Sequence, residues 1–314
     1  MLGIPGNHDW YDAIEGFAAT FFTEAAARRT MHARIEVDNR ITGTTDRHID
    51  ELIAEAARLR RLYGVPTGFQ RASFFQLHTR DFALVAVDTG VIRRVDAAQQ
   101  AWLRAALDAA RGKFTMAILG HPLYAGGHYT AEEDEDFSAL HHLLREHDVA
   151  IVMAGDTHDL EYYLEPGSGG GQGSVTHVVN GGGGAYLSFG TALDWPVPPA
   201  TSAWAFHPTT AQVTDKIRAT LPPWKVPFWW WTQYLRAWPY SVEWLSAAFD
   251  VNVAPFYQSF VEVRVEPSTG RVRLRPYGIN GRLRWADLQT SPELRPTGAA
   301  PEDPVEWSLP LTAR

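Results

Sequence analysis

Three apolar runs in this chain of 314 residues each end in side chains that can bind a metal or transfer a proton. The run LGIPG is followed by Asn7-His8-Asp9, and the run MAILG by His121. The run IVMAG is followed by Asp156-Thr157-His158-Asp159. In open α/β sheets, binding sites form outside the carboxyl ends of the strands. Imidazole nitrogen, amide oxygen and carboxylate oxygen suit Mn, Fe, Zn or Mg rather than copper(I). The pattern therefore predicts a metal site where three strands end.

Each of these motifs is weak when it is taken alone. A single loop histidine such as His121 is more often a hydrogen-bonded residue than a metal ligand. A single asparagine such as Asn7 is more often a turn residue. Their joint occurrence, each at the end of an expected strand, is what favours a shared site.

The elements that must position these residues alternate between helix and strand. Helices are expected at 11–34, 48–64, 97–110 and 131–147, and strands within 72–90, 113–124, 149–159 and 174–180. Thr44-Thr45-Asp46 has the residue types of a cap at the start of the second helix. This alternation favours an α/β layered fold. A β-hairpin is expected at 258–279, with its turn at Pro267–Gly270.

Composition narrows the class of partner. The net charge is -8 and no block of Lys and Arg occurs, so an extended nucleic-acid groove is not expected. The chain has no cysteine, which excludes disulfides and cysteine-bound zinc. There is no run of 18 apolar residues and no visible signal peptide.

The three motifs together resemble those of the calcineurin-like metallophosphoesterases. Gly6-Asn7-His8-Asp9 is similar to the third motif of that family, Gly120-His121 to the fourth, and Gly155-Asp156-Thr157-His158 to the fifth. The strand pair ending in Asp88-Thr89 and the helix containing QQAWL also look like the family. The resemblance covers roughly residues 1–190. It implies a four-layer α/β sandwich of two mixed sheets flanked by helices.

The resemblance also assigns roles to single residues. Asn7 and His121 would ligate the second of two divalent metal ions, and His158 the first. Asp156 stands where the family usually has a histidine ligand, and we expect it to ligate through its carboxylate. His8 would protonate the leaving oxygen. The implied activity is metal-dependent hydrolysis of a small phosphomonoester or phosphodiester.

The first two motifs of the family are absent from the chain. Asp46-Arg47-His48 has the letters of the first motif, but its polar helix start favours a cap. Without these motifs the first metal keeps too few ligands for a tight site. We therefore expect an N-terminally truncated enzyme. The alternative is a non-catalytic binding domain with an incomplete metal site.

Other segments have more ordinary interpretations. We expect one domain over 1–285, with the Pro- and Trp-rich segment 195–256 as an insertion or cover, and a loosely held Pro-rich tail at 286–314. Within it, the tryptophans of 222–246 favour a cover, and contact with a membrane surface is the weaker alternative. His141, His142 and His147 are expected to face solvent or the end of their helix. Gly181–Gly184 is expected to form a tight turn.

Overall fold

The chain forms two compact units, which we describe separately. The first holds Met1–His78, Leu84–Ala109 and Ala117–His121, and the second holds Thr79–Ala83, Ala110–Met116 and Pro122–Arg314. The structure is a computed structural model. It describes residues 1–38, 44–132, 134–167, 173–183, 204–206, 219, 222–227, 258–288, 295 and 297–312.

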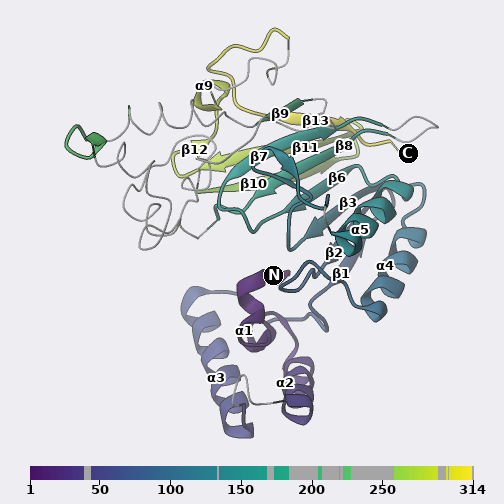
Figure 1. The fold of residues 1–314 in the computed structure, drawn as a ribbon, viewed down its shortest axis with the longest axis vertical. Coiled ribbons are helices and arrows are strands. Elements are labelled where there is room, and N and C mark those ends of the chain that lie inside the picture. Colours follow the sequence, from purple (N-terminus) through teal and green to yellow (C-terminus); the bar gives the residue numbers. More distant parts are fainter. Residues whose placement is uncertain are drawn as a thin grey trace. The chain divides into compact units, whose positions relative to one another are not determined.

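The first unit begins with a group of helices (Figure 1). They are the 3-10 helix η1 (Asn7–Trp10) and the α-helices α1 (Glu15–Phe21), α2 (Glu24–Asp38) and α3 (Asp46–Tyr63). Thr45 caps α3 by accepting a hydrogen bond from the His48 amide, and Gly64 ends it in the left-handed conformation at φ 64°. The cap expected at this position is confirmed, because Thr45 satisfies an amide that the helix leaves unpaired.

The single helix expected at 11–34 is interrupted at Phe22 and Thr23. Phe22 is extended, with ψ at 162°, and forms an isolated bridge with Gln70. The Thr23 amide donates to the Gln70 carbonyl at 2.9 Å, and the Gln70 amide donates to the Phe21 carbonyl at 3.1 Å. Periodicity alone missed this break, since its cause is a pairing with a residue far along the chain and neither glycine nor proline marks it.

The remaining elements confirm the α/β alternation. The strands are β1 (Phe75–His78), β2 (Phe82–Val87), β3 (Phe114–Leu119), β4 (Tyr124–Ala125), β5 (His128–Tyr129), β6 (Ile151–Ala154), β7 (Leu160–Glu165), β8 (Val175–Asn180) and β9 (Trp204–Phe206). The helices between them are α4 (Ala97–Ala109) and α5 (Glu135–Glu146). The larger sheet has the strand order β1-β2-β3-β6-β8-β7-β9. It is mixed, because β6 runs parallel to β8 whereas β7 runs antiparallel to both β8 and β9.

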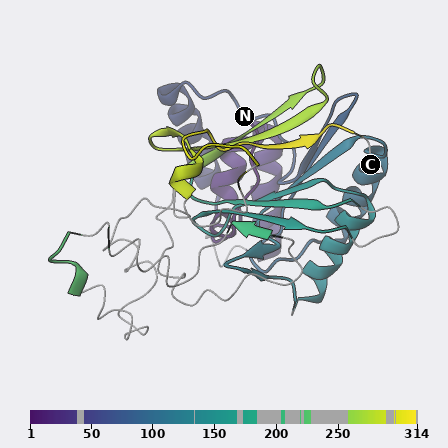
Figure 2. The ribbon, with the colours of Figure 1, turned by 90° about the horizontal axis from the view of Figure 1, so that it is seen from above.

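A second sheet packs against β7 and β8 within the second unit (Figures 1 and 2). Its strands are β10 (Ser259–Glu266), β11 (Arg271–Gly278), β12 (Gly281–Arg282) and β13 (Trp307–Pro310), and all their described pairings are antiparallel. Tyr162 of β7 stacks on Trp307 with ring centroids 4.2 Å apart. The hydroxyl of Ser259 donates to the side-chain oxygen of Asn180 at 2.9 Å. The hairpin expected at 258–279 is therefore confirmed.

For the described residues of 286–314, the expectation of a loosely held tail is wrong. The chain forms the short helix α9 (Trp285–Leu288) and later returns as β13, which pairs with β11. Val305 and Trp307 are buried, at 0% and 6% exposure. Its proline content alone predicts a loosely held segment, but burial of these apolar side chains holds its end in the sheet.

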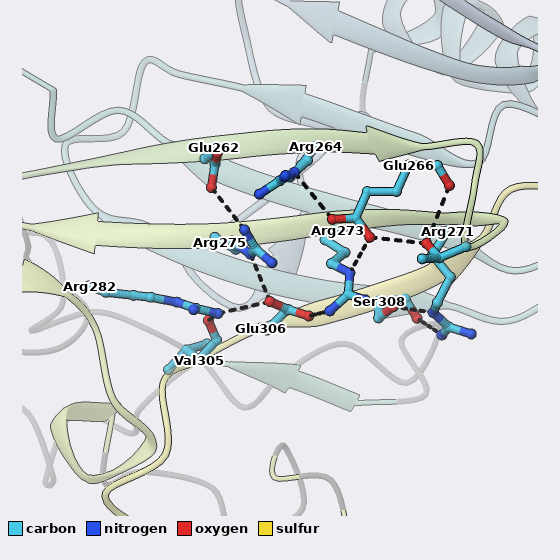
Figure 3. Close-up of polar contacts among 11 residues, drawn as sticks. Glu262, Arg264, Glu266, Arg271, Arg273, Arg275, Arg282, Val305, Glu306 and Ser308 are labelled. Atoms are coloured by element: carbon cyan, nitrogen blue, oxygen red, sulfur yellow. Dashed lines mark hydrogen bonds and ion pairs between the residues drawn. The ribbon is translucent and has the colours of Figure 1, made fainter.

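The outer face of the second sheet carries alternating charges (Figure 3). Glu306 accepts hydrogen bonds from Arg273, Arg275 and Arg282 at 2.6, 2.7 and 2.9 Å. Glu266 accepts from Arg273 at 2.9 Å. Side chains alternate between the two faces of a strand. On β11, Arg273 and Arg275 therefore lie on one face, and Val272 and Leu274 face the core on the other.

Most of the Pro- and Trp-rich segment lies outside the described residues. Of 195–256, the described parts include β9, which pairs with β7, and residues 222–227, where Trp224 is 75% exposed. The interpretation of 222–246 as a cover or membrane contact therefore stays a prediction. Among the described residues, no helix is both long enough and apolar enough to cross a lipid bilayer.

Candidate functional site

The loop after Pro5 folds into η1 and presents Asn7 and His8. The Gly6 amide donates to Asp9 Oδ2 at 2.9 Å, so Asp9 closes the start of its own turn. The carboxamide oxygen of Asn7 accepts a hydrogen bond from the His8 amide at 2.8 Å. His8 is exposed, and its ring lies 4.7 Å from that of Tyr11. The loop thus holds an amide oxygen and an accessible imidazole side by side.

Within the first unit, the His121 loop lies against this N-terminal loop. A Cβ atom on Gly120 would lie 2.6 Å from Thr89 Oγ1 and 3.2 Å from the carbonyl oxygen of Pro5, so only glycine fits there. His121 is 3% exposed, and its Nδ1 lies 2.7 Å from the hydroxyl of Thr89. The loops that carry Asn7 and His121 therefore meet, with Thr89 beside Gly120. The strand expected before Asn7 is not formed, because residues 1–6 have no regular secondary structure, whereas the strand expected before His121 is β3.

Asp88, at the end of β2, anchors the same region. Its Oδ1 accepts hydrogen bonds from the Trp10 indole at 3.0 Å and from the Gly90 amide at 2.9 Å. Burial raises the pKa of Asp88, and these donors act in the opposite direction. The Asp88 amide donates to Gln99 Oε1 at 2.8 Å, which ties the strand end to α4. Asp88 therefore positions η1 from within the buried part of the unit.

Backbone strain occurs beside two of the candidate motifs. Ala13 and Ile14, just after η1, have φ values of 59° and 61°, and Asp156 has a φ of 72°. A positive φ is unfavourable for residues other than glycine, and for a branched side chain such as that of Ile14 it is rare. Strain of this kind is concentrated at functional sites.

In the second unit, Asp156 and His158 lie in the tight loop between β6 and β7. Both are partly exposed. The Gly181 amide donates to the Asp159 carbonyl at 3.1 Å, and a Cβ atom on Gly181 would lie only 1.9 Å from the Thr157 carbonyl oxygen. The backbone of Gly181 therefore packs so closely against this loop that a side chain has no room there.

The described residues place the candidate side chains as follows. Asn7, His8 and His121 belong to the first unit, and Asp156 and His158 belong to the second. Two loops of the first group are in contact around Thr89, and the second group shares one loop. The ligand set as a whole stays a prediction.

A pair of buried carboxyl groups follows this loop, and the sequence did not reveal it. Asp159 and Glu161 are 1% and 0% exposed, and their side chains are hydrogen-bonded to each other. Burial raises the pKa of Asp159 to about 6. Burial, together with the charge of Asp159, raises that of Glu161 well above its usual range. One proton shared between the two groups avoids burying two negative charges.

Glu161 also anchors the turn between β4 and β5. The Gly126 amide donates to its two carboxylate oxygens at 3.1 and 3.0 Å, and the Tyr163 hydroxyl donates to Glu161 as well. The Gly127 amide donates to that hydroxyl oxygen at 2.9 Å. Glu161 and Tyr163 thus hold the Gly126–Gly127 turn in place through these hydrogen bonds.

A second polar cluster lies on the same face of β7. It contains His141, Glu165 and His177, whose potential ligand atoms all lie within 4.8 Å of one another. The expectation that His141 faces solvent is wrong, since it is 8% exposed and contacts Glu165, whereas His142 is exposed as expected. The sequence did contain a signal for these polar residues of β7. In the segment LEYYLE, alternation along a strand puts Glu161, Tyr163 and Glu165 on one face.

Comparison with known proteins gives a weak structural likeness. No protein-family model matches the chain, and no curated protein sequence matches it. The chain is similar to purple acid phosphatase PPD1 from seeds of yellow lupin (Lupinus luteus), with a TM-score of 0.41 and 16% identity, over 77% of this chain and 36% of that one. It is also similar to GAP50, the anchor in the inner membrane complex of Plasmodium, with a TM-score of 0.33 and 15% identity, over 45% of each chain. Similarity of this extent leaves the function to be argued from the residues of the site.

Proposed function

We propose that the protein is a metal-dependent hydrolase of phosphomonoesters or phosphodiesters. In this proposal Asn7, His121, Asp156 and His158 are metal ligands and His8 is the proton donor. The observation that carries it is the close approach of two motif-bearing loops, in which Gly120 packs against Pro5 and Thr89. Sequence motifs that are weak singly gain weight when the chain brings their loops together.

The donor groups fit a divalent metal ion. His121 Nδ1 lies 2.7 Å from the Thr89 hydroxyl, a contact of the kind that orients a metal-binding histidine, and Nε2 would be the atom that holds the ion. The Asn7 carboxamide and the Asp156 carboxylate supply oxygen donors, which favour Mn, Fe or Mg and also suit Zn. When bound, such ions would neutralise the phosphoryl oxygens and activate a water molecule.

The chain's own residues supply the rest of the chemistry. Cleavage of a phosphoester leaves a negative charge on the departing oxygen, which a proton donor stabilises. His8 is exposed beside Asn7, and its imidazole is a group that can hold and donate a proton. The contact of its ring with that of Tyr11, at an angle of 41°, limits the orientations of that donor.

The proposal is tested by substituting His121 in the full chain. Hydrolysis of p-nitrophenyl phosphate and of bis(p-nitrophenyl) phosphate is measured with Mn²⁺, Fe²⁺, Zn²⁺ or Mg²⁺ added. We expect His121→Ala to lower turnover by at least about 100-fold, with an unchanged circular dichroism spectrum. His32→Ala, on the surface of α2, is the matched control and should keep full turnover. Equal turnover in the two variants would refute the role of His121.

A further inference from the structure

We propose that His141, Glu165 and His177 bind one divalent cation of the Zn²⁺ class, at a site that uses none of the ligands proposed above. The three residues come from α5, β7 and β8, all within the second unit. Two imidazoles and one carboxylate are a common protein ligand set for Zn²⁺, with a fourth position left to water. This inference does not depend on the proposed function.

The register of the sheet brings the three side chains together. In the antiparallel pair of β7 and β8, Tyr163 lies opposite His177 and Glu165 lies opposite Val175. Glu165 and His177 are therefore diagonal neighbours on one face of the sheet. His141 reaches the same point from the buried side of α5. Three rigid elements thus fix the positions of the potential ligands.

The contacts are close to those of a metal site. Nε2 of His141 and Nε2 of His177 lie 2.9 and 2.8 Å from the same oxygen, Glu165 Oε2. Bonds of about 2.0–2.1 Å around a tetrahedral Zn²⁺ separate neighbouring ligand atoms by about 3.3 Å. Each of these two nitrogen–oxygen distances would therefore need to grow by only about 0.5 Å to admit the ion. The Glu165 side chain is 14% exposed, which leaves a route from solvent.

Surrounding groups orient the ligands as the partners of metal ligands do. The Tyr129 hydroxyl lies 2.8 Å from Nδ1 of His141, and Arg145 Nε lies 3.6 Å from the other oxygen of Glu165. The Arg145 guanidinium donates to the carbonyl of Gly173 at 3.0 Å, which keeps it in place. Such contacts fix which nitrogen and which oxygen face the ion.

A simple ion pair explains the cluster less well. Arg145 already lies 3.6 Å from Glu165 as a cationic partner, so neutralising this carboxylate does not by itself require two imidazoles at its other oxygen. His177 is 2% exposed, and its Nδ1 has no hydrogen-bond partner in the described part of the chain, so only Nε2 holds that ring by hydrogen bonding. A cation bound by all three groups gives each of them a role.

The test uses Co²⁺ as a spectroscopic substitute for Zn²⁺. The full chain carrying His121→Ala, so that a strand-end metal does not contribute, is stripped with a chelator and titrated with Co²⁺. We expect one ion per chain, with the visible absorption of tetrahedral Co²⁺, and its loss when one equivalent of Zn²⁺ is added. Turnover is not the readout, so a failure here is distinct from a failure of the proposed function.

Three further substitutions in this background decide the assignment. His141→Ala and Glu165→Gln should each weaken Co²⁺ binding by at least about 10-fold. His142→Ala, at the next residue of α5 with a side chain 74% exposed, should bind as the background protein does. Glu165→Gln preserves the size of the side chain and thereby separates lost ligation from lost packing. Absence of the absorption in the background protein, or equal affinity in all three variants, would overturn the proposal.

Discussion

The hydroxyl of Thr89 lies 2.7 Å from Nδ1 of His121, and the two residues are 0% and 3% exposed. Thr89→Val removes this hydroxyl and keeps the side-chain volume. If His121 is a metal ligand, the concentration of Mn²⁺ needed for half-maximal turnover should rise by about 10-fold. Thr89→Ser should restore it. An unchanged Mn²⁺ requirement in Thr89→Val would contradict a positioning role for Thr89.

Gly181 should tolerate no side chain. A Cβ atom there would lie 1.9 Å from the backbone oxygen of Thr157, which cannot move without displacing the loop. We expect Gly181→Ala to lower the free energy of unfolding by at least about 2 kcal/mol, measured by urea denaturation. Gly155→Ala is the control, because its Cβ would meet only Gly181 Cα, at 4.0 Å. Similar losses in both variants would show that the clash with Thr157 is not the cause.

The buried pair of Asp159 and Glu161 should make stability depend on pH. Burial raises the pKa of Asp159 from 3.8 to about 6, so the folded state binds a proton more tightly than the unfolded state does. The associated stability is fully present below about pH 4 and is lost as the pH rises through about 6. Between about pH 5 and about pH 7.5 this loss amounts to about 1 kcal/mol. Asp159→Asn should therefore lose less stability over that interval than the wild type.

Urea unfolding of the two proteins at several pH values measures this difference. Asp50→Asn, which removes an exposed carboxylate on α3, should follow the wild-type curve. If Asp159→Asn also follows that curve, the buried carboxyl does not carry the extra proton.

Glu306 should stabilise the second sheet at neutral pH. Burial raises the pKa of Glu306, but hydrogen bonds from Arg275 and Arg273 outweigh this, and its pKa is lowered (Figure 3). We expect Glu306→Gln to lose about 1 kcal/mol of unfolding free energy at neutral pH. The lowered pKa means that this contribution is present above the usual pKa of a glutamate and is lost as the pH falls through the lowered pKa of Glu306, so the two proteins should converge in acid. The exposed Glu302 offers the control Glu302→Gln; a deficit in Glu306→Gln that persists in acid would argue for lost packing instead.

Local residue types predicted much of the fold. Thr45 and Gly64 mark the ends of α3, and the turn at Pro267–Gly270 joins β10 to β11, because caps and turns depend on residues close in the chain. The break at Phe22 and the strand β13 depend on distant partners, Gln70 and β11. The local periodicity and composition of a segment do not indicate which distant residues it will pair with.

The candidate functional residues also fall into those that the local sequence indicates and those that depend on distant partners. Apolar runs ending in polar residues indicated the loops of Asn7 and His121, and in the first unit these loops meet around Thr89. The cluster of His141, Glu165 and His177 was missed, since it joins one helix and two strands through a register that appears only in the folded chain. The sequence predicts solvent or the helix end for His141 because its position in α5 alone does not say which side of the helix is buried.

The measurement that tests the central claim most directly is the metal dependence of phosphoester hydrolysis by the full chain. The protein is stripped with a chelator, and the release of p-nitrophenol from bis(p-nitrophenyl) phosphate and from p-nitrophenyl phosphate is followed as Mn²⁺ is added back. Our account predicts little turnover in the stripped protein and a saturable return with Mn²⁺, absent in His121→Ala. Turnover that survives stripping, or none with any of Mn²⁺, Fe²⁺, Zn²⁺ and Mg²⁺, would contradict it.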